Sequence, residues 1–210
     1  MIKIILFDLA GPVLSVYDDL FFPWLLKHGS KNTSWTIEQL NKVWEKHMYP
    51  AEEDHYSEYE AFERVKKELA IEIDSLTLQN KRQSFVSLNE CTVELILKLK
   101  KKGYKLMFAT NNAAEEFARN YYQFDLGNLF DYGRASYHLK SRKTKKVFFE
   151  QYIQLLNVKL EEILKPEEII FIDDGEKNLK APAELGIKTI HFKEVNQLID
   201  DLKQLGVTLD

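Results

Sequence analysis

The chain has 210 residues, with 29 Lys and Arg residues against 33 Asp and Glu residues, and a formal net charge of −4. This length suits one domain with an insertion, and a chain of this size buries roughly 70% of its unfolded surface, so it needs no disulfide or structural metal to hold a core. The negative charge argues against a broad nucleic-acid-binding surface, because phosphate backbones select for an excess of Lys and Arg.

The number of cysteines and the hydropathy of the chain indicate the cellular compartment in which the protein works. Cys91 is the only cysteine, so no intramolecular disulfide can form, as is typical of proteins in a reducing interior. The apolar run Ile4–Phe7 is far shorter than a signal-peptide core, and no apolar stretch approaches the ~20 residues of a membrane span. We therefore expect a cytoplasmic protein that does not associate with membranes. The residues around Cys91 predict a helix that buries this side chain. The sequence leaves the oligomeric state open.

The pattern of apolar residues predicts a first strand and, after it, a long helical insertion. Residues 2–7 are nearly all apolar and rich in β-branched Ile, which predicts a central strand of a parallel sheet, and Gly11 and Pro12 predict a loop after it. From about residue 15 to 88 no strand-like run occurs, and apolar residues recur at the spacing of amphipathic helices. Two such helices carry Ile37, Leu40, Val43 and Trp44, and Phe62, Val65 and Leu69. We interpret the aromatic residues mainly as the core of this insertion, although Phe21, Phe22 and Trp24 are also placed to line a pocket mouth.

Helices and strands alternate from residue 89 onward. The pattern predicts helices over 92–102, 113–123 and 145–156, and another that ends at Gly186; it predicts strands over 105–109, 131–136, 168–172 and 188–192. Strands separated by helices in this rhythm indicate a doubly wound parallel sheet. The predicted fold class is therefore α/β, with residues 1–14 and 89–210 as the core domain and residues 15–88 as an inserted helical domain.

Polar side chains follow three of the predicted strands at the point where each strand ends. Asp8 follows the first strand, residues 110–112 (TNN) follow the strand 105–109, and Asp173 and Asp174 follow the strand 168–172. In an open α/β sheet, ligands bind outside the carboxyl ends of the strands. Carboxylates and other oxygen ligands, without a cluster of His or Cys, favour a hard cation such as Mg²⁺ over Zn²⁺.

These segments resemble the motifs of the haloacid dehalogenase superfamily, in the family's order. Residues 7–14 (FDLAGPVL) resemble its first motif, DxDGTL or DxDGVL, and residues 109–112 (ATNN) resemble its second motif. Residues 171–178 (FIDDGEKN) resemble its fourth motif in the DDxxxN form, and residues 178–186 are similar to the phosphatase domain of soluble epoxide hydrolases. The helical segment 15–88 stands where subclass I members insert a cap.

The resemblance implies a Mg²⁺-dependent hydrolase that acts on a small phosphorylated metabolite. Asp8 is then the nucleophile that forms an aspartyl-phosphate, which divides one displacement into two. Mg²⁺ is held by Asp8, the backbone carbonyl of Ala10 and Asp174, and it neutralises charge on the transferring phosphoryl group. Asp173 and Asn178 lie in or beside the metal shell and orient it.

The resemblance also implies which residues hold the phosphoryl group. Thr110 and nearby backbone N–H groups donate hydrogen bonds to it, with help from Asn111. The family's third motif supplies a Lys, and the motif order places Lys143 at that position, although Thr144 and Lys145 depart from the usual Pro-Asp. Three neighbouring lysines are alternatives for this role: Lys140, Lys145 and Lys146.

Ala10 is the departure with the largest chemical consequence. The family's phosphatases carry a second Asp at this position, which protonates the leaving alcohol and then activates water. An alanine side chain does neither, and general acid–base catalysis supplies a factor of ~10²–10⁴ in rate. The metal is less affected, because position 10 contributes only its carbonyl.

Four explanations of Ala10 are open. The protein is an impaired member that binds phosphorylated ligands or a partner; or its substrate, such as an acyl phosphate, has a leaving group that needs little protonation; or Ala10 is an engineered substitution in an active phosphatase. The fourth explanation is an acid or base borrowed from the insertion, where the candidates are His28, His47, His55, Glu52, Glu53 and Asp54. A smaller possibility is a phosphonatase-like C–P hydrolase, whose motif also carries Ala and in which Lys27 or Lys31 would form a Schiff base.

Overall fold

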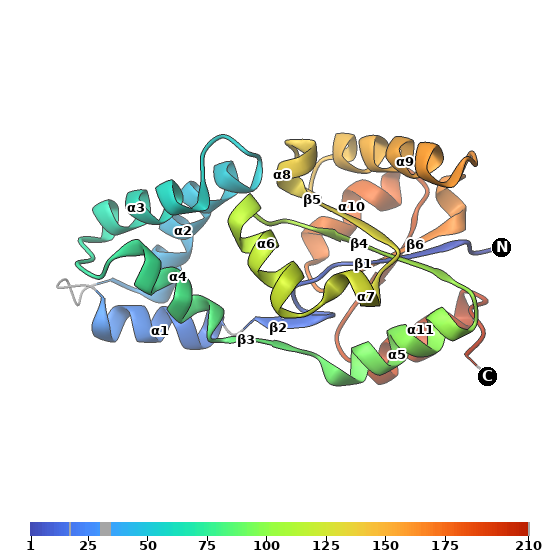
Figure 1. Ribbon diagram of the computed structural model, residues 1–210, viewed down its shortest axis with the longest axis horizontal. Helices are drawn as coiled ribbons and strands as arrows, with labels where there is room; N and C mark the ends of the chain where they lie inside the picture. The colour runs from blue at the N-terminus through green and yellow to red at the C-terminus, as the bar shows by residue number, and fades with distance from the viewer. Residues whose placement is uncertain (17, 30–34, 210) are drawn as a thin grey trace.

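A parallel five-stranded sheet forms the centre of the protein (Figure 1). The computed structural model describes residues 1–16, 18–29 and 35–209. The strand order is β5-β4-β1-β6-β7, and the central strand β1 pairs in parallel with both β4 and β6. The strands of this sheet are β1 (Ile4–Phe7), β4 (Lys105–Thr110), β5 (Tyr132–Ala135), β6 (Ile169–Asp173) and β7 (Lys188–His191). All four residues of β1 are buried, because apolar layers cover both faces of the sheet.

Helices cover the sheet on its two faces, and the alternation of side chains along β1 divides the core between them. Ile5 and Phe7 belong to the apolar cluster with α5 (Glu90–Lys101) and α11 (Val195–Gln204), whereas Ile4 and Leu6 belong to the cluster with α9 (Lys146–Leu160) and α10 (Glu176–Glu184). The remaining helices of this part are α6 (Ala114–Gln123), α7 (Leu126–Leu129), α8 (Ser136–Leu139) and the short 3₁₀ helix η1 (Pro166–Glu168). The predicted doubly wound α/β class is confirmed.

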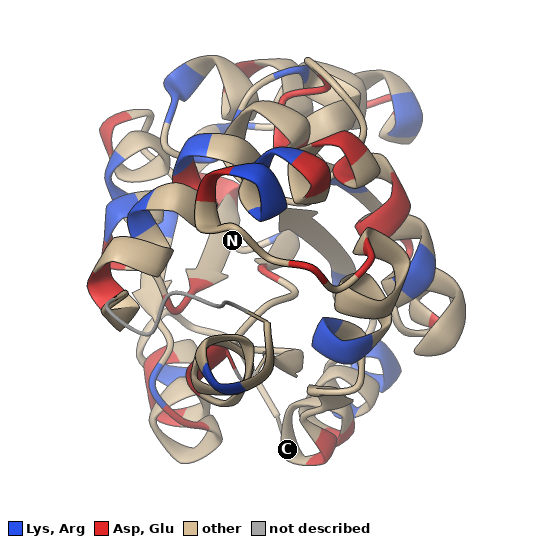
Figure 2. Cartoon of the chain, turned by 90° about the vertical axis from the view of Figure 1, so that its left-hand side faces the viewer, with Lys and Arg blue, Asp and Glu red and all other residues tan. Residues whose placement is uncertain are grey.

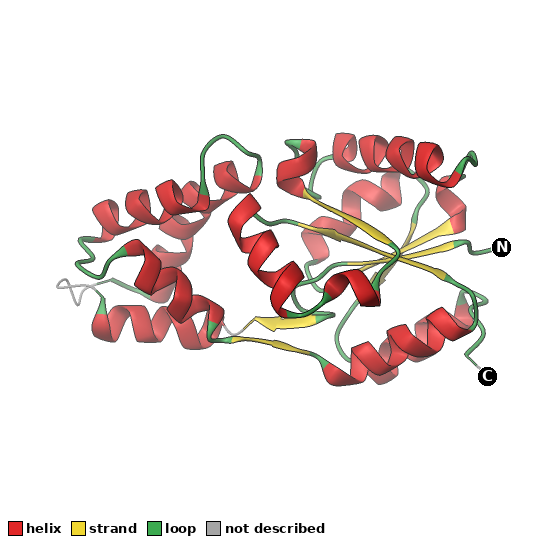
Figure 3. Cartoon of the chain, in the orientation of Figure 1, coloured by secondary structure: helices red, strands yellow, loops and turns green. Residues whose placement is uncertain are grey.

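Four helices form a helical insertion that lies at one end of the molecule (Figure 3). They are α1 (Asp18–His28), α2 (Ile37–Glu52), α3 (Glu58–Leu69) and α4 (Ser75–Gln83). Phe21 and Phe22 are buried in the insertion's own apolar core, and Trp24 packs against it, which supports the interpretation of these aromatic residues as core. Acidic and basic residues are interspersed along the helices that face the viewer in Figure 2. None of the described helices is long and apolar enough to cross a membrane.

Three features differ from the sequence-based expectation. The insertion is joined through two antiparallel strands, β2 (Leu14–Val16) and β3 (Val86–Leu88), which are too short to show a period. Helix α11 was not predicted, although its buried residues Leu198 and Leu202 stand at helical spacing. Cys91 is exposed, so the prediction of a packed thiol is wrong. The buried face of α5 is Thr92, Leu95, Ile96 and Leu99, and Cys91 lies off this stripe.

Candidate active site

The carboxyl ends of three adjacent strands bring the predicted acidic residues together. Because β1 lies between β4 and β6, Asp8 stands between the segment after β4 and the pair Asp173 and Asp174 at the end of β6. Carboxylate oxygens of Asp8, Asp173 and Asp174 all lie within 4.8 Å of one another. Asp8 and Asp173 are buried, whereas Asp174 is more exposed. Their proximity follows from sheet order, which places strands far apart in sequence side by side.

Lys143 is the cation of this cluster. Its Nζ lies 2.5 Å from Oδ2 of Asp8 and 2.7 Å from Oδ2 of Asp173, and the residue is only 1% exposed. Burial alone would lower the pKa of Lys143, but the two carboxylates raise it above its ordinary value, so this side chain stays charged. The alternatives face elsewhere: Lys140 pairs with Asp54, Lys145 with Glu53 and Lys146 with Glu184.

Asp173 is held by the loop that follows it. Its Oδ1 accepts hydrogen bonds from the backbone N–H of Gly175 (2.8 Å) and from Nδ2 of Asn178 (2.9 Å), while Oδ2 meets Lys143. With both oxygens engaged, Asp173 is better placed to orient the site than to ligate an ion with its full charge. Asp174 differs, since its carboxyl group lies against the backbone of Gly11, where a Cβ atom would come within 2.3 Å of Cγ.

The charges of the site suit a divalent cation. Three carboxylates face one ammonium group, which leaves two negative charges unbalanced. Burial raises the pKa of Asp8 well above its ordinary value, Lys143 opposes this effect, and the neighbouring carboxylates add to it. Burial and Asp173 likewise raise the pKa of Asp174. An all-oxygen donor set with this excess charge fits Mg²⁺, a hard cation.

The segment after β4 forms a hydrogen-bonded network beside the carboxylates. Oγ1 of Thr110 donates to Oδ1 of Asn112 (2.8 Å), and the backbone N–H of Asn112 donates to Oγ of Ser136 (3.2 Å). Oδ1 of Asn111 accepts a hydrogen bond from the backbone N–H of Lys143 (3.0 Å). Asn111 therefore joins the end of β4 to the loop that carries the buried lysine. Thr110 is 1% exposed and is the last residue of β4.

Ala10 lies in the tight turn between β1 and β2. The turn is closed by the backbone N–H of Gly11, which donates to the carbonyl of Leu14 (2.8 Å). Ala10 itself forms an isolated bridge to Leu14 and is half-buried. Its methyl group adds no proton donor or acceptor, so any acid or base has to come from another part of the chain, from water or from the substrate.

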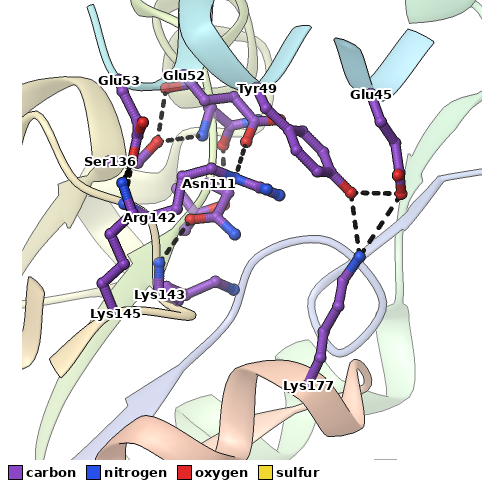
Figure 4. Close-up of polar contacts among 12 residues, drawn as sticks. Glu45, Tyr49, Glu52, Glu53, Asn111, Ser136, Arg142, Lys143, Lys145 and Lys177 are labelled. Atoms are coloured by element: carbon purple, nitrogen blue, oxygen red, sulfur yellow. Dashed lines mark hydrogen bonds and ion pairs between the residues drawn. The ribbon is translucent and has the colours of Figure 1, made fainter. Parts of the chain in front are cut away.

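Residues at the C-terminal end of α2 meet the loop that carries Lys143 (Figure 4). Oε2 of Glu52 lies 2.6 Å from Nε of Arg142, and the Arg142 guanidinium carbon lies 3.2 Å from the centre of the Tyr49 ring. Burial raises the pKa of Glu52 to about 7, in spite of Arg142. Oε1 of Glu53 accepts from the backbone N–H of Arg142 (3.2 Å). Lys177, on α10, donates to the hydroxyl of Tyr49 (3.0 Å).

The other predicted candidates of the insertion are less involved. His47 lies 2.7 Å from Glu68 within the insertion, and His55 lies 3.9 Å from Glu53 with most of its side chain exposed. His28 and Lys27 are exposed at the end of α1, and Lys31 lies outside the described residues. Of the residues proposed as a borrowed acid or base, Glu52 and Glu53 are the half-buried ones that contact Arg142 in the loop of Lys143.

Sequence reasoning did not select Arg142, Tyr49 or Ser136. Arg142 carried a signal, since it directly precedes the predicted phosphate-contacting lysine. The sequence around Tyr49 gave no such signal, because only the packing of α2 on the loop of Lys143 brings the Tyr49 ring to Arg142.

Comparisons with known proteins show the family and the fold of the chain. The haloacid dehalogenase-like hydrolase family model matches residues 2–186, whereas the comparison with curated proteins gave no match. One similar structure is a HAD family enzyme from Bacteroides thetaiotaomicron in complex with magnesium and inorganic phosphate, with 21% identity, TM-score 0.72, and coverage of 92% of this chain and 95% of that chain. A predicted HAD-like family hydrolase from Porphyromonas gingivalis has 19% identity, TM-score 0.70, and coverage of 97% and 98%. A HAD phosphatase from Thermococcus onnurineus has 16% identity, TM-score 0.68, and coverage of 100% of both chains. At these identities the structures share the fold.

Proposed function

Because the chain belongs to the haloacid dehalogenase-like hydrolase family, we propose that it is a Mg²⁺-dependent phosphohydrolase of small phosphorylated metabolites. The observation that carries the proposal is the position of Lys143, whose Nζ lies between Asp8 and Asp173 at the carboxyl edge of the sheet. A buried ammonium group next to a potential nucleophile is suited to a transferring phosphoryl group, which carries charge on all its equatorial oxygens.

Asp8 is the proposed nucleophile. One of its carboxylate oxygens attacks phosphorus, the bond from phosphorus to the leaving oxygen breaks, and an aspartyl-phosphate results, which water then hydrolyses. Its backbone N–H donates to the carbonyl of Ile172 (2.8 Å), and its Oδ1 accepts from the backbone N–H of Leu9 (2.7 Å), so the carboxylate is fixed in direction. Lys143 holds it near the phosphoryl group. Asn111 donates a hydrogen bond to that group, and so does Thr110 once its hydroxyl proton turns from Oδ1 of Asn112 to a phosphoryl oxygen.

Asp8, Asp174 and the carbonyl of Ala10 are the proposed ligands of Mg²⁺, with Asp173 and Asn178 as the residues that orient them. When bound, the ion neutralises charge on the phosphoryl oxygens. The complex of the B. thetaiotaomicron enzyme with magnesium and inorganic phosphate supports the choice of Mg²⁺ as the ion. An aspartate-to-alanine variant of that enzyme is also described in complex with both, so binding of the two tolerates the loss of one aspartate there.

Ala10 restricts the chemistry that the site performs well. We expect slow turnover of alkyl phosphates, whose leaving alkoxides need a proton, and faster turnover of acyl or aryl phosphates. The helical insertion, for which we keep the boundaries 15 and 88, is the proposed cap domain. Asp8 and Lys143 are only 4% and 1% exposed, so we infer that the cap domain moves to admit the substrate. We propose that the protein works in the cytoplasm.

The test is Mg²⁺-dependent hydrolysis of p-nitrophenyl phosphate and acetyl phosphate by the unmodified chain, by Ala10→Asp and by Asp8→Asn. We expect activity of the unmodified chain on acetyl phosphate, an increase on both substrates in Ala10→Asp, and loss of activity in Asp8→Asn. If Asp8→Asn retains the activity, Asp8 is not the nucleophile. If all three proteins are silent, the alternative, a phosphate-ligand- or partner-binding protein on the same fold, replaces the hydrolase.

A further inference from the structure

Arg142 directly precedes the buried lysine of the site and turns to the same side of the loop. In Figure 4 its side chain lies between Lys143 and helix α2, so it stands on the insertion side of Lys143. The leaving group of a phosphate ester attacked by Asp8 points away from Asp8, because the attacking and leaving oxygens are in line with phosphorus. A leaving group that extends from the side of Lys143 toward the insertion comes to Arg142.

The Arg142 side chain is held in place but its hydrogen-bonding capacity is not used up. Its guanidinium stacks on the ring of Tyr49 at 3.2 Å, and its closest ion pair is the 2.6 Å contact from Nε to Glu52. Among the described residues, no hydrogen bond is donated by its Nη1 or Nη2. A stacked guanidinium with free terminal N–H groups is preorganised to bind a planar carboxylate with two parallel hydrogen bonds.

Glu52 places a carboxylate against Arg142, and this carboxylate is poorly stabilised there. Burial raises its pKa to about 7, and the nearby carboxylate of Glu116 acts in the same direction, against the opposing effects of Arg142 and Arg82. A carboxylate in this condition is easily neutralised or displaced. A substrate carboxylate that enters with the phosphate can therefore bind the Nη1 and Nη2 groups of Arg142 with little competition from Glu52.

We propose that Arg142 is a specificity-determining residue that binds a carboxylate on the leaving group, so that the substrates are phosphorylated carboxylic acids. Tyr49 is the positioning residue that holds the guanidinium by stacking. The inference rests on the proposed phosphate site, but it adds a second recognition point that the phosphate chemistry does not require.

The test is binding of non-hydrolysable phosphonates to the full chain with Mg²⁺, measured by calorimetry. Phosphonoacetate and phosphonopropionate carry a carboxylate, and ethylphosphonate and propylphosphonate are their matched probes without one. We expect the unmodified chain to bind at least one carboxylated probe about 10- to 100-fold more tightly than its match, since hydrogen bonds to charged groups contribute about 1.5–3 kcal/mol.

Three variants distinguish binding of a substrate carboxylate by Arg142 from a purely structural contact between the insertion and the loop. Arg142→Gln should lose the preference while its affinity for the alkyl phosphonates changes less than about threefold, and Glu52→Gln should raise the affinity for the carboxylated probe. Lys145→Gln, which removes a different ion pair between the insertion and the same loop, should keep the preference. If Arg142→Gln and Lys145→Gln affect all four probes equally, Arg142 is only a structural contact and the proposal is wrong. Equal binding of all probes by the unmodified chain also overturns it, whereas no binding of any probe contradicts the phosphate site itself.

Discussion

The carboxyl group of Asp174 occupies the space that a side chain on Gly11 would need. A Cβ atom on Gly11 would lie 2.3 Å from Cγ of Asp174 and within 2.7 Å of both carboxylate oxygens. Gly11 also has a φ of +87°, which disfavours any other residue. The first turn of the chain therefore determines where the most exposed of the three carboxylates can sit.

Gly11→Ala should displace Asp174 and weaken Mg²⁺ binding by at least tenfold, measured by calorimetry. Gly103→Ala is the matched control, because Gly103 has a similar φ of +84° but no atom of the described residues lies within 4 Å of the added methyl group. Both variants carry backbone strain of about 1–2 kcal/mol, so their difference isolates the clash with Asp174. Equal Mg²⁺ affinity in the two variants would remove Asp174 from the metal site.

Lys143→Met should destabilise the protein by about 3–5 kcal/mol, because it leaves the buried carboxylates of Asp8 and Asp173 without their cation. Urea unfolding measures this loss. Mg²⁺ should restore part of the stability of this variant, since the ion supplies positive charge to the same carboxylates. Lys145→Met is the control. Lys145 is 54% exposed and its ion pair with Glu53 should contribute less than about 1 kcal/mol. A Lys143→Met protein as stable as the control would contradict the role of Lys143 in the cluster.

Much of the sheet and part of the site could be predicted, because both depend on short-range patterns. The apolar strand that ends on Asp8, and the one that ends on Asp173 and Asp174, are visible in the sequence, and parallel strands bring their ends to one edge. Choosing Lys143 among four lysines needed the motif order of the family, because the local sequence does not distinguish it from the neighbouring lysines. Only the structure shows that this side chain is buried.

The contacts between the insertion and the rest of the chain could not be predicted. Tyr49 and Glu52 lie on α2, about 90 residues before Arg142, and no periodicity reports which helix end faces which loop. The exposed position of Cys91 shows a related limit. Its neighbours are apolar enough to predict a buried helix face, but the phase of the helix places Thr92 on that face instead.

Thr110→Val should lower both stability and phosphate affinity. Thr110 donates to Oδ1 of Asn112, so the variant leaves a buried oxygen without its donor, at a cost of about 1–3 kcal/mol. We expect the Kd for inorganic phosphate with Mg²⁺ to rise about tenfold. Thr92→Val is an isosteric control in a buried position. The Thr92 hydroxyl has no hydrogen-bond partner among the described residues, so this variant should be neutral or stabilising. If phosphate binds Thr110→Val and Thr92→Val equally well, the Thr110 hydroxyl does not contact phosphate.

Glu52→Gln should make the protein relatively more stable as the pH rises. The pKa of Glu52 is raised from 4.5 to about 7, with burial as the largest cause, so the folded protein binds a proton there more tightly than the unfolded chain. Stability from this group is therefore present at low pH and is lost as the pH rises from about 4.5 through 7, by up to about 3 kcal/mol. Glutamine has no proton to lose and escapes this loss.

Urea unfolding of the unmodified chain and of Glu52→Gln at pH 5 and pH 8 measures the effect. The variant leaves Arg142 without its carboxylate at both pH values, so only the change in the stability difference between the two pH values reports the titration of Glu52. We expect this difference to shift in favour of the variant at pH 8. Glu53→Gln, which alters the next residue and its exposed contact with Lys145, should change stability by no more than about 1 kcal/mol at either pH. A difference that stays constant, or that shifts in favour of the unmodified chain at pH 8, would mean that Arg142 keeps Glu52 ionised. The carboxylate would then be a firm partner of Arg142, and a substrate carboxylate would have to compete with it directly.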